Sequence, residues 1–253
     1  MTVVVAYKWA ANPQDASVGA DGAVDWSRAR AALSEYDPIA AQVARNLADT
    51  NGTEVVGVSV GTSALSGSMP SKSAMSRGMD RGLVVADDSV ADWNLTQVAA
   101  ALAKLVERVG DADIVFTGEG SIDENAKMVP ALLAGFLGWP AFFDVAAVER
   151  EGAGWRITQN IPGGSRTIEV DGPVVAAVAT DAAQPKIPGM KDILAAGKKP
   201  VESVPAAELG IAETSAEVTG RSRPPHRERA QQRYEGGGAA TELAAALKSA
   251  GLV

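Results

Sequence analysis

Short runs of branched apolar residues alternate along the first half of this chain with longer stretches rich in Ala and Leu. The runs cover 3–6, 54–60, 82–86 and 113–117. Val- and Ile-rich runs of this length favour buried strands, and the stretches between them favour helices. Repeated strand–helix units favour a mostly parallel sheet with helices on both faces. We therefore predict an α/β fold with a doubly wound, mostly parallel, Rossmann-like sheet.

The first long helix of this pattern has recognisable ends. Asp37 is predicted to be its N-cap, with Pro38 at the first helical position, where the missing N–H of proline does no harm. Asn51 and Gly52 are predicted to end it. Further helices are predicted at 71–78, 96–109 and 132–137.

The second half of the chain changes its pattern. Two β-prone runs, 155–158 and 166–170, flank the turn residues 162–164. Strands joined by such a turn favour an antiparallel pair. The apolar run 174–179 is then predicted to rejoin the main sheet. The sheet is therefore expected to carry a small antiparallel addition.

From residue 203 the composition changes again. The stretch 221–229 is basic and proline-containing, so it is not expected to form a core of its own, and an Ala/Leu-rich helix is predicted at 239–250. We predict an α/β domain at 1–202 and a C-terminal arm at 203–253. The arm either lies across another subunit or is a linker followed by a helix docked on the same chain.

Composition excludes several classes of function. The 253 residues carry a net charge of -8, which argues against nucleic acid as a partner. The chain has no cysteine and one histidine, which excludes disulfides, thiol catalysis and multi-histidine metal sites. We expect no metal and no catalytic residues. No apolar run approaches the roughly 18 residues needed to span a bilayer, so a cytoplasmic protein is predicted.

Polar and glycine residues follow the predicted strands at the edge where doubly wound sheets bind ligands. Gly118 and Gly120 allow a ligand to approach the backbone, and the start of the next helix suits a phosphate. Lys127 adds a positive charge, and Asp37 is placed to meet a ribose or an adenine edge. These features indicate a nucleotide cleft without a Walker loop or a GxGxxG motif, although such turns also serve simple chain reversal. Packing or an interface is favoured for Trp9, Trp26 and Trp93.

Residues 178–201, VATDAAQPKIPGMKDILAAGKKPV, contain prolines, a pair of lysines and the apolar residues Ile187, Met190, Ile193 and Leu194. Met, Ile and Leu side chains on a segment interrupted by prolines are typical of a surface that binds partner proteins. An ordinary surface loop that packs its own apolar residues remains the alternative.

Several blocks of the sequence together resemble the beta subunit of electron-transfer flavoproteins, and most closely its FixA branch. The blocks occur in family order and at family spacing, and they are VAYKWAANPQD, DGAVDWSRARAALSEYDPIAAQVA, VVGVSVG, SRGMDRGLVV, TGEGSIDENAKMVP, the 178–201 stretch and the C-terminal arm. The resemblance covers almost the whole chain. It implies a sheet of the adenine nucleotide alpha hydrolase-like type.

The resemblance also implies a heterodimer. A partner alpha subunit would hold FAD, and this subunit would bind AMP in a structural role or, as in bifurcating members, a second FAD. Carried over to this chain, the cofactor-binding residues would be Ala6, Lys8, Tyr36, Asp37, Ser59, Val60, Gly61, Gly118, Gly120, Ser121, Asp123, Ala126, Lys127, Met128 and Val129. In the phosphate loop Lys127 and Met128 replace the amide residues of the family, and Pro130 replaces a glycine.

The function implied is that of an electron carrier rather than an enzyme. The subunit would relay electrons between an acyl-CoA-type or other flavoprotein dehydrogenase and the flavin, with a carnitine-type pathway as one setting. The partner-docking residues would be Ile187, Met190, Ile193, Leu194, Lys198 and Lys199. A stand-alone adenine-nucleotide-binding module or nucleotide-acting enzyme is the first alternative. A scaffold subunit that binds no nucleotide is the second.

Overall fold

The computed structural model describes residues 1–213, 219–220, 225–228 and 231–253. They form two compact units, Met1–Thr219 and Gly220–Val253. The second unit contains helix α6 (Ala239–Ser249), which has no buried residue, at the position predicted from the sequence. The basic stretch predicted at 221–229 lies largely outside the described residues.

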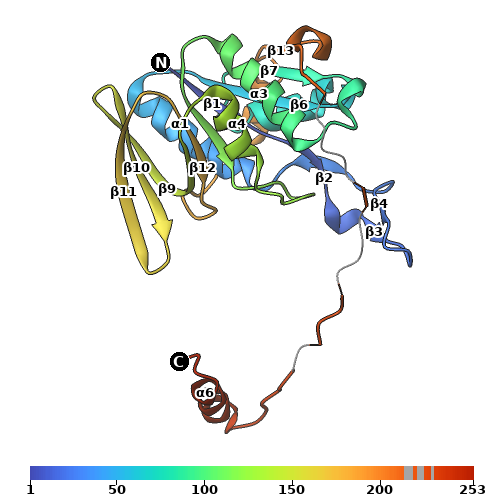
Figure 1. Ribbon diagram of the computed structural model, residues 1–253, viewed down its shortest axis with the longest axis vertical. Coiled ribbons are helices and arrows are strands. Elements are labelled where there is room, and N and C mark those ends of the chain that lie inside the picture. The colour runs from blue at the N-terminus through green and yellow to red at the C-terminus, as the bar shows by residue number, and fades with distance from the viewer. Residues whose placement is uncertain (214–218, 221–224, 229–230) are drawn as a thin grey trace. The chain divides into compact units, whose positions relative to one another are not determined.

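The first unit is built on one nine-stranded sheet (Figure 1). Its strands run in the order β11-β10-β9-β12-β8-β1-β6-β7-β13. The strand bounds are β1 (Thr2–Ala6), β6 (Val55–Gly61), β7 (Arg81–Ala86), β8 (Ala112–Gly118), β9 (Ala141–Glu151), β10 (Gly154–Ile161), β11 (Gly164–Asp171), β12 (Val174–Val178) and β13 (Val201–Ser203). Only the β9–β10 and β10–β11 pairs are antiparallel. The predicted mostly parallel sheet with an antiparallel addition is therefore confirmed.

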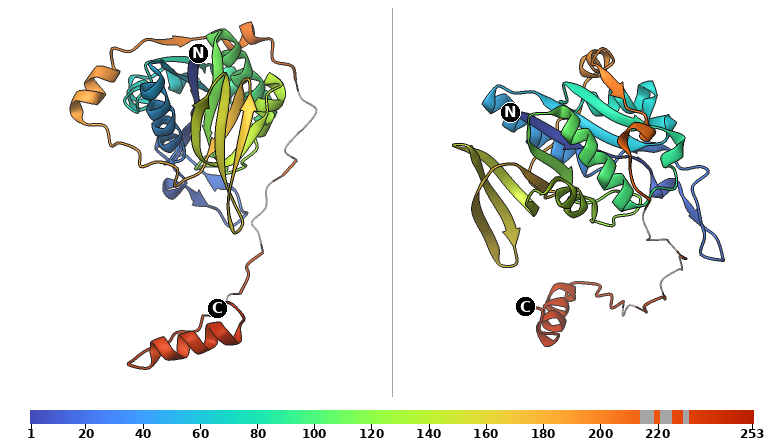
Figure 2. Two further views of the ribbon diagram at one scale, coloured as in Figure 1. Left: turned by 90° about the vertical axis from the view of Figure 1, so that its left-hand side faces the viewer. Right: turned by 45° about the horizontal axis from the view of Figure 1, so that its top comes forward.

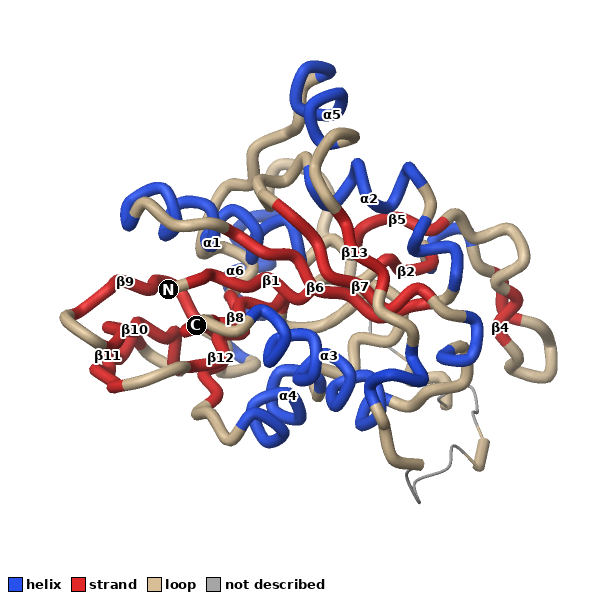
Figure 3. The backbone as a smooth tube through the Cα atoms, turned by 90° about the horizontal axis from the view of Figure 1, so that it is seen from above, coloured by secondary structure: helices blue, strands red, loops and turns tan. Residues whose placement is uncertain are grey.

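Helices cover both faces of the sheet. Their bounds are α1 (Asp37–Asn51), α2 (Ser68–Met75), α3 (Leu95–Val109), α4 (Val129–Leu137) and α5 (Met190–Ala196). Figure 3 shows α1 and α2 on one side of the strands and α3 and α4 on the other. Each side has its own apolar core, with Ala44 and Met75 in one and Leu105 and Leu133 in the other. Small Ala side chains on α1 let the helix pack closely on the strands.

The chain changes direction beside β1. From β1 it moves outward to β6 and β7, and it then returns to the other side of β1 for β8 and β12. The crossover helices accordingly change faces between the two halves. In such sheets the carboxyl ends of the two strands at the reversal leave a crevice between them. Here those ends are Ala6 of β1 and Gly118 of β8.

The segment between β1 and α1 forms two small antiparallel sheets. Strand β2 (Trp9–Ala11) pairs with β5 (Ala31–Leu33), and β3 (Ser17–Val18) pairs with β4 (Val24–Asp25). Strand β2 follows closely on the end of β1, and its residue Trp9 faces the crevice.

Three local predictions need correction. Asp37 is not the N-cap of α1, because the helix begins at Asp37 itself and Tyr36 is the capping residue. The carboxylate of Asp37 instead accepts a hydrogen bond from the Lys8 N–H at 2.7 Å. Strand β9 and the short strand β13 were not predicted. Helix α2 begins and ends about three residues before the predicted stretch.

Packing against the first unit continues beyond residue 203. The Val204 N–H donates to the Val84 carbonyl at 2.7 Å, and Ala206 and Leu209 are buried. The contacts thus divide the chain after Thr219, whereas the composition already changes at residue 203. Within the described residues, no helix is both long enough and apolar enough to cross a membrane.

Candidate functional site

A cleft of about 380 Å³ opens at the carboxyl ends of β1, β6 and β8. Strand β1 and the residues after it contribute Ala6 to Trp9, and β6 and the residue after it contribute Val60 to Thr62. The loop between β8 and α4 forms the opposite wall, from Thr117 to Pro130. The cleft therefore lies at the reversal of the sheet, where doubly wound folds bind their ligands.

Two glycines let the wall of the cleft fold tightly. A Cβ atom on Gly118 would lie 2.5 Å from the Tyr36 Cβ and 2.9 Å from Oδ1 of Asp37. A Cβ atom on Gly120 would lie 2.6 Å from Oδ1 of Asn125. Real Cβ atoms do not approach other atoms this closely, so position 118, next to the Tyr36 backbone, requires glycine, whereas at position 120 the end of the Asn125 side chain could move aside. Gly118 thereby allows β8 to meet the start of α1.

Asp37 ties the two strands at the reversal together. Its buried carboxylate accepts hydrogen bonds from the backbone N–H groups of Lys8, after β1, and Gly118, at the end of β8. Burial raises the pKa of Asp37 to about 8, although these N–H groups and the charge of Lys8 oppose the shift. Burial, with the Asp37 charge as a smaller cause, also raises the pKa of the Tyr7 hydroxyl.

The Lys8 ammonium is held on the floor of the cleft. Its Nζ lies 2.8 Å from Asp123 Oδ2 and 3.9 Å from the Glu124 carboxylate. Burial opposes ionisation of Asp123, but the hydrogen bonds from Lys8 and Ser121 outweigh it and lower the pKa of Asp123. This pair links the end of β1 to the loop after β8.

The loop between β8 and α4 is strained next to the cleft. Asn125 and Lys127 have φ values of 48° and 54°, in the left-handed region that side chains other than glycine rarely adopt. Nζ of Lys127 lies 3.3 Å from Oε2 of Glu119. A left-handed Lys127 followed by a right-handed Met128 turns successive N–H groups towards one side, which is how backbone nests bind anions. Pro130 lines the cleft but offers no N–H.

One buried polar atom of the cleft has no partner. Thr117 is 5% exposed, and among the described residues its Oγ1 has no hydrogen-bond partner. Thr117 is the residue before the last of β8, and it lines the cleft. Because an unsatisfied buried hydroxyl costs about 1–3 kcal/mol, such an atom indicates a place for a polar ligand group or a water molecule.

Sequence reasoning missed the apolar wall of the cleft. This wall comes from the turn after β7 and the start of α3, and it consists of Val90, Ala91, Trp93, Leu95, Val98 and Leu102. Packing or an interface was predicted for Trp93 and Trp9, and both line the cleft. The sequence did contain a signal for this wall. The strand β7 was predicted, and its carboxyl end lies at the same edge of the sheet as those of β1 and β8. An apolar wall opposite polar loops suits the flat face of an aromatic base.

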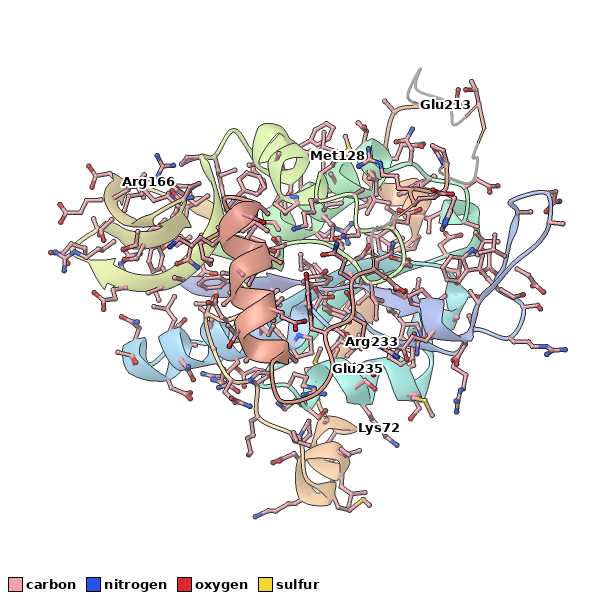
Figure 4. The ribbon with its side chains drawn as sticks, turned by 90° about the horizontal axis from the view of Figure 1, so that it is seen from below. Lys72, Met128, Arg166, Glu213, Arg233 and Glu235 are labelled. Atoms are coloured by element: carbon pink, nitrogen blue, oxygen red, sulfur yellow. The ribbon has the colours of Figure 1, made fainter. Side chains whose placement is uncertain are left out.

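Most of the predicted cofactor residues come together in this cleft. Those that line it are Ala6, Lys8, Asp37, Val60, Gly61, Gly118, Gly120, Ser121, Asp123, Ala126, Lys127 and Val129. The other three lie elsewhere. Tyr36 lines a neighbouring depression with Ile122 and Thr180, and Ser59 is buried with its hydroxyl donating to the Tyr7 carbonyl at 2.7 Å. Met128 is half exposed on the loop before α4 (Figure 4).

The predicted docking segment, residues 187–199, lies away from the cleft. Figures 2 and 3 show α5 projecting beyond the helices that cover the sheet. Ile187, Met190 and Leu194 are 86%, 73% and 64% exposed, and Ile193 is also exposed. The segment is held at its ends, where the Lys186 N–H donates to Gln42 Oε1 at 2.9 Å.

The two lysines of this segment differ. Nζ of Lys199 donates to the Met75 and Met79 carbonyls at 3.1 and 2.5 Å, so it fixes the segment to the end of α2. Lys198 is exposed and makes no ion pair with the other described residues. Lys198 is therefore the lysine presented to solvent.

Among the described residues, no group of three or more His, Cys, Asp or Glu side chains is arranged to hold a metal ion.

A doubly wound sheet with a cleft at its reversal defines the class of Rossmann-like α/β proteins. A family model, the electron transfer flavoprotein domain, matches residues 22–209, which is more than half of the chain, and the chain belongs to this family. Proteins of this family are electron carriers associated with flavin rather than enzymes.

Proposed function

We propose that this chain is the beta subunit of an electron-transfer flavoprotein of the FixA type. It would pair with an alpha subunit that carries FAD and relay electrons between a dehydrogenase and other redox partners. The observation that carries the proposal is the cleft at the sheet reversal, in a chain of the electron transfer flavoprotein family. We further propose that the heterodimer is cytoplasmic and that the C-terminal arm of this chain, residues 203–253, contacts the alpha subunit.

Several features of the cleft support an adenine nucleotide as its ligand. The wall around Val90 and Trp93 suits the base, and Gly118 lets the end of β8 pack against the start of α1 beside the cleft. Among the described residues the Thr117 hydroxyl has no hydrogen-bond partner, and a left-handed Lys127 followed by a right-handed Met128 has the backbone pattern of an anion-binding nest.

The bound group decides what this chain does chemically. A flavin would supply electron-carrying chemistry, whereas AMP would supply none and would stabilise the fold. In either case the residues of this chain bind and orient the group: Asp37 fixes the two strand ends, and Lys8 and Asp123 fix the loop to the floor.

The exposed apolar segment suits the docking of a partner dehydrogenase. Four apolar side chains, Ile187, Met190, Ile193 and Leu194, are exposed on and before α5, and such a cluster on a projecting helix favours contact with another protein. The FixA resemblance suggests an acyl-CoA-type or other flavoprotein dehydrogenase, with a carnitine-type pathway as one setting.

The proposal can be tested by co-expressing this chain with a candidate alpha subunit. FAD and AMP are then counted per purified heterodimer. One FAD and one AMP would make this chain a structural and docking subunit. Two FAD would assign a redox flavin to it. No copurifying flavoprotein would contradict the proposal.

A stand-alone adenine-nucleotide-binding module or nucleotide-acting enzyme is the second candidate, because a single chain forms the whole cleft. Hydrolysis of ATP by the isolated chain, abolished by Lys8→Met, would favour this candidate.

A further inference from the structure

The buried polar side chains of the described residues differ in one respect. Six of them are buried, and they are Thr2, Ser34, Asp37, Ser59, Thr117 and Gln159. Five take part in hydrogen bonds within the fold. The hydroxyl of Thr117 has no hydrogen-bond partner among the described residues. Because buried polar groups are normally satisfied, this hydroxyl requires an explanation.

The neighbours of Thr117 in the sheet are apolar. Thr117 pairs with Ala6 of β1 on one side and with Ala177 of β12 on the other. Beyond Ala6, the same row continues through Val58 and Leu83. Ala6, Val58 and Leu83 belong to the core beneath α3 and α4, and paired residues of neighbouring strands share a face of the sheet. Thr117 is therefore the one polar side chain in this row of five.

The fold gains nothing from this hydroxyl. Valine has nearly the same shape as threonine and would fill the position without leaving a buried polar atom unpaired. Among the described residues, two other buried polar atoms have no hydrogen-bond partner, Arg45 Nε and Trp155 Nε1, and neither residue lines the cleft. Thr117 does line it. The hydroxyl therefore points to a bound ligand.

Thr117 lies on the apolar side of the cleft. Helix α3 covers the same face of the sheet, and its residues Val98 and Leu102 line the cleft next to Trp93. Such a wall packs against the flat face of a ring, whose polar edge then needs a partner. Rotation about the Cα–Cβ bond moves a threonine hydroxyl between staggered positions about 120° apart, so a ligand group can draw it towards the cleft.

We propose that Thr117 is a base-contacting residue, whose hydroxyl forms a hydrogen bond with the polar edge of the adenine ring. A hydroxyl both donates and accepts, so it can pair with a ring nitrogen or with the exocyclic amine. This inference rests on the proposed adenine-nucleotide site. It goes beyond that site in naming the side chain that contacts the base edge and in assigning to it a loss of stability in the free protein.

The substitution Thr117→Val should therefore have opposite effects on folding and on binding. In the free protein it removes an unpaired hydroxyl, so the midpoint of urea unfolding should rise. In the complex it leaves the edge of the base against a methyl group, so the Kd for AMP should rise about tenfold. Thr117→Ser keeps the hydroxyl and should retain most of the affinity.

Thr2 supplies the matched control. It is 3% exposed on the neighbouring strand β1, and its hydroxyl donates to Asp111 Oδ1 at 2.6 Å. It lies at the opposite end of β1 from the cleft. Thr2→Val removes a satisfied hydroxyl, so it should lower the midpoint of urea unfolding and leave the Kd for AMP unchanged.

Isothermal titration of the full chain with AMP and with adenosine locates the contact. Adenosine has the base but no phosphate, so Thr117→Val should weaken the binding of both ligands by the same factor. A loss for AMP alone would assign the hydroxyl to the phosphate and overturn the inference. An unchanged Kd for AMP in Thr117→Val, or a lower midpoint of unfolding, would also overturn it.

Failure of the proposed function would give a different result. A wild-type chain that binds neither AMP nor adenosine would contradict the nucleotide site and, with it, the contact to the base. Binding of AMP that is equally tight in the wild type and in Thr117→Val would contradict the contact alone.

Discussion

The cleft and the docking segment are built on opposite principles. In the cleft, Asp37 joins two strand ends through backbone hydrogen bonds, and Lys8 joins the end of β1 to the next loop. In the docking segment, Ile187, Met190 and Leu194 lie largely in solvent, and only the ends of the segment are fixed. The cleft side chains support the fold, whereas the exposed apolar side chains of the docking segment add little to it.

This difference separates binding from stability. A substitution in the cleft is expected to change the free energy of unfolding together with ligand binding, because the same contacts serve both. A substitution among the exposed residues of the segment is expected to change only the interaction with a partner, since it removes no buried contact. The following predictions test that separation.

The largest effect is expected from Leu194→Asp. A charge in the middle of the apolar cluster should slow electron transfer to the partner dehydrogenase at least about 30-fold, as for a central interface residue. The midpoint of urea unfolding should not change. Stopped-flow flavin reduction in the heterodimer measures the first quantity.

Met69→Asp is the control, because Met69 is 70% exposed on α2 but lies outside the segment. It should leave transfer unchanged. Unchanged transfer in Leu194→Asp would refute the docking role, and a large loss of stability would show that the two regions are not separate.

Asp37→Asn should change the pH dependence of stability. The folded pKa of Asp37, about 8, is above its ordinary value of 3.8, so the favourable contribution of the protonated group is complete below 3.8 and is lost as pH rises through about 8. The wild type should lose about 1.4 kcal/mol per pH unit in this window through Asp37. Urea unfolding at a series of pH values should show a shallower slope for the variant.

Asn keeps an oxygen that accepts the N–H of Lys8, so the variant should fold. Asp181→Asn, on an exposed side chain, should retain the wild-type slope. A slope that does not change in Asp37→Asn would mean that Asp37 is ionised in the fold throughout.

Gly118→Ala should destabilise the protein by about 1–3 kcal/mol, because the added methyl group would lie 2.5 Å from the Tyr36 Cβ and force β8 away from α1. Affinity for AMP should fall as well. Gly135→Ala is the matched control: no atom lies within 4 Å of its Cβ position on α4, so it should be neutral or stabilising by about 0.5–1 kcal/mol. Equal stabilities of the two variants would contradict the close approach.

The smallest effects should separate the two lysines of the docking segment. Lys199→Met removes two hydrogen bonds to the end of α2 and should cost about 1–2 kcal/mol in unfolding free energy. Lys198→Met should leave stability unchanged and reduce the association rate with the dehydrogenase only a few-fold, in a salt-dependent way. A reversal of these two results would assign docking to Lys199.

Sequence patterns predicted the elements whose signal is local. The apolar runs of β1, β6, β7, β8 and β12, and the helices between them, follow from side-chain periodicity, which is a property of neighbouring residues. Strand β9 escaped prediction because its run, AFFDVAAVERE, has no regular alternation, and its register with both neighbouring strands shifts within it. The apolar wall at Val90 and Trp93 escaped for another reason: the turn after β7 reaches the cleft only through the order of strands in the sheet.

The sequence by itself determined the fold class, and it predicted the edge of the sheet at which a ligand would bind and the exposed apolar segment before residue 200. The tertiary structure decided which side chains meet there. Asp37 was expected to cap a helix and instead joins Lys8 and Gly118, and Gln159 bonds to the Phe143 carbonyl on a strand that was not predicted. Local periodicity sets secondary structure, but the partner of a buried polar group depends on strand order and register, which distant parts of the chain fix together.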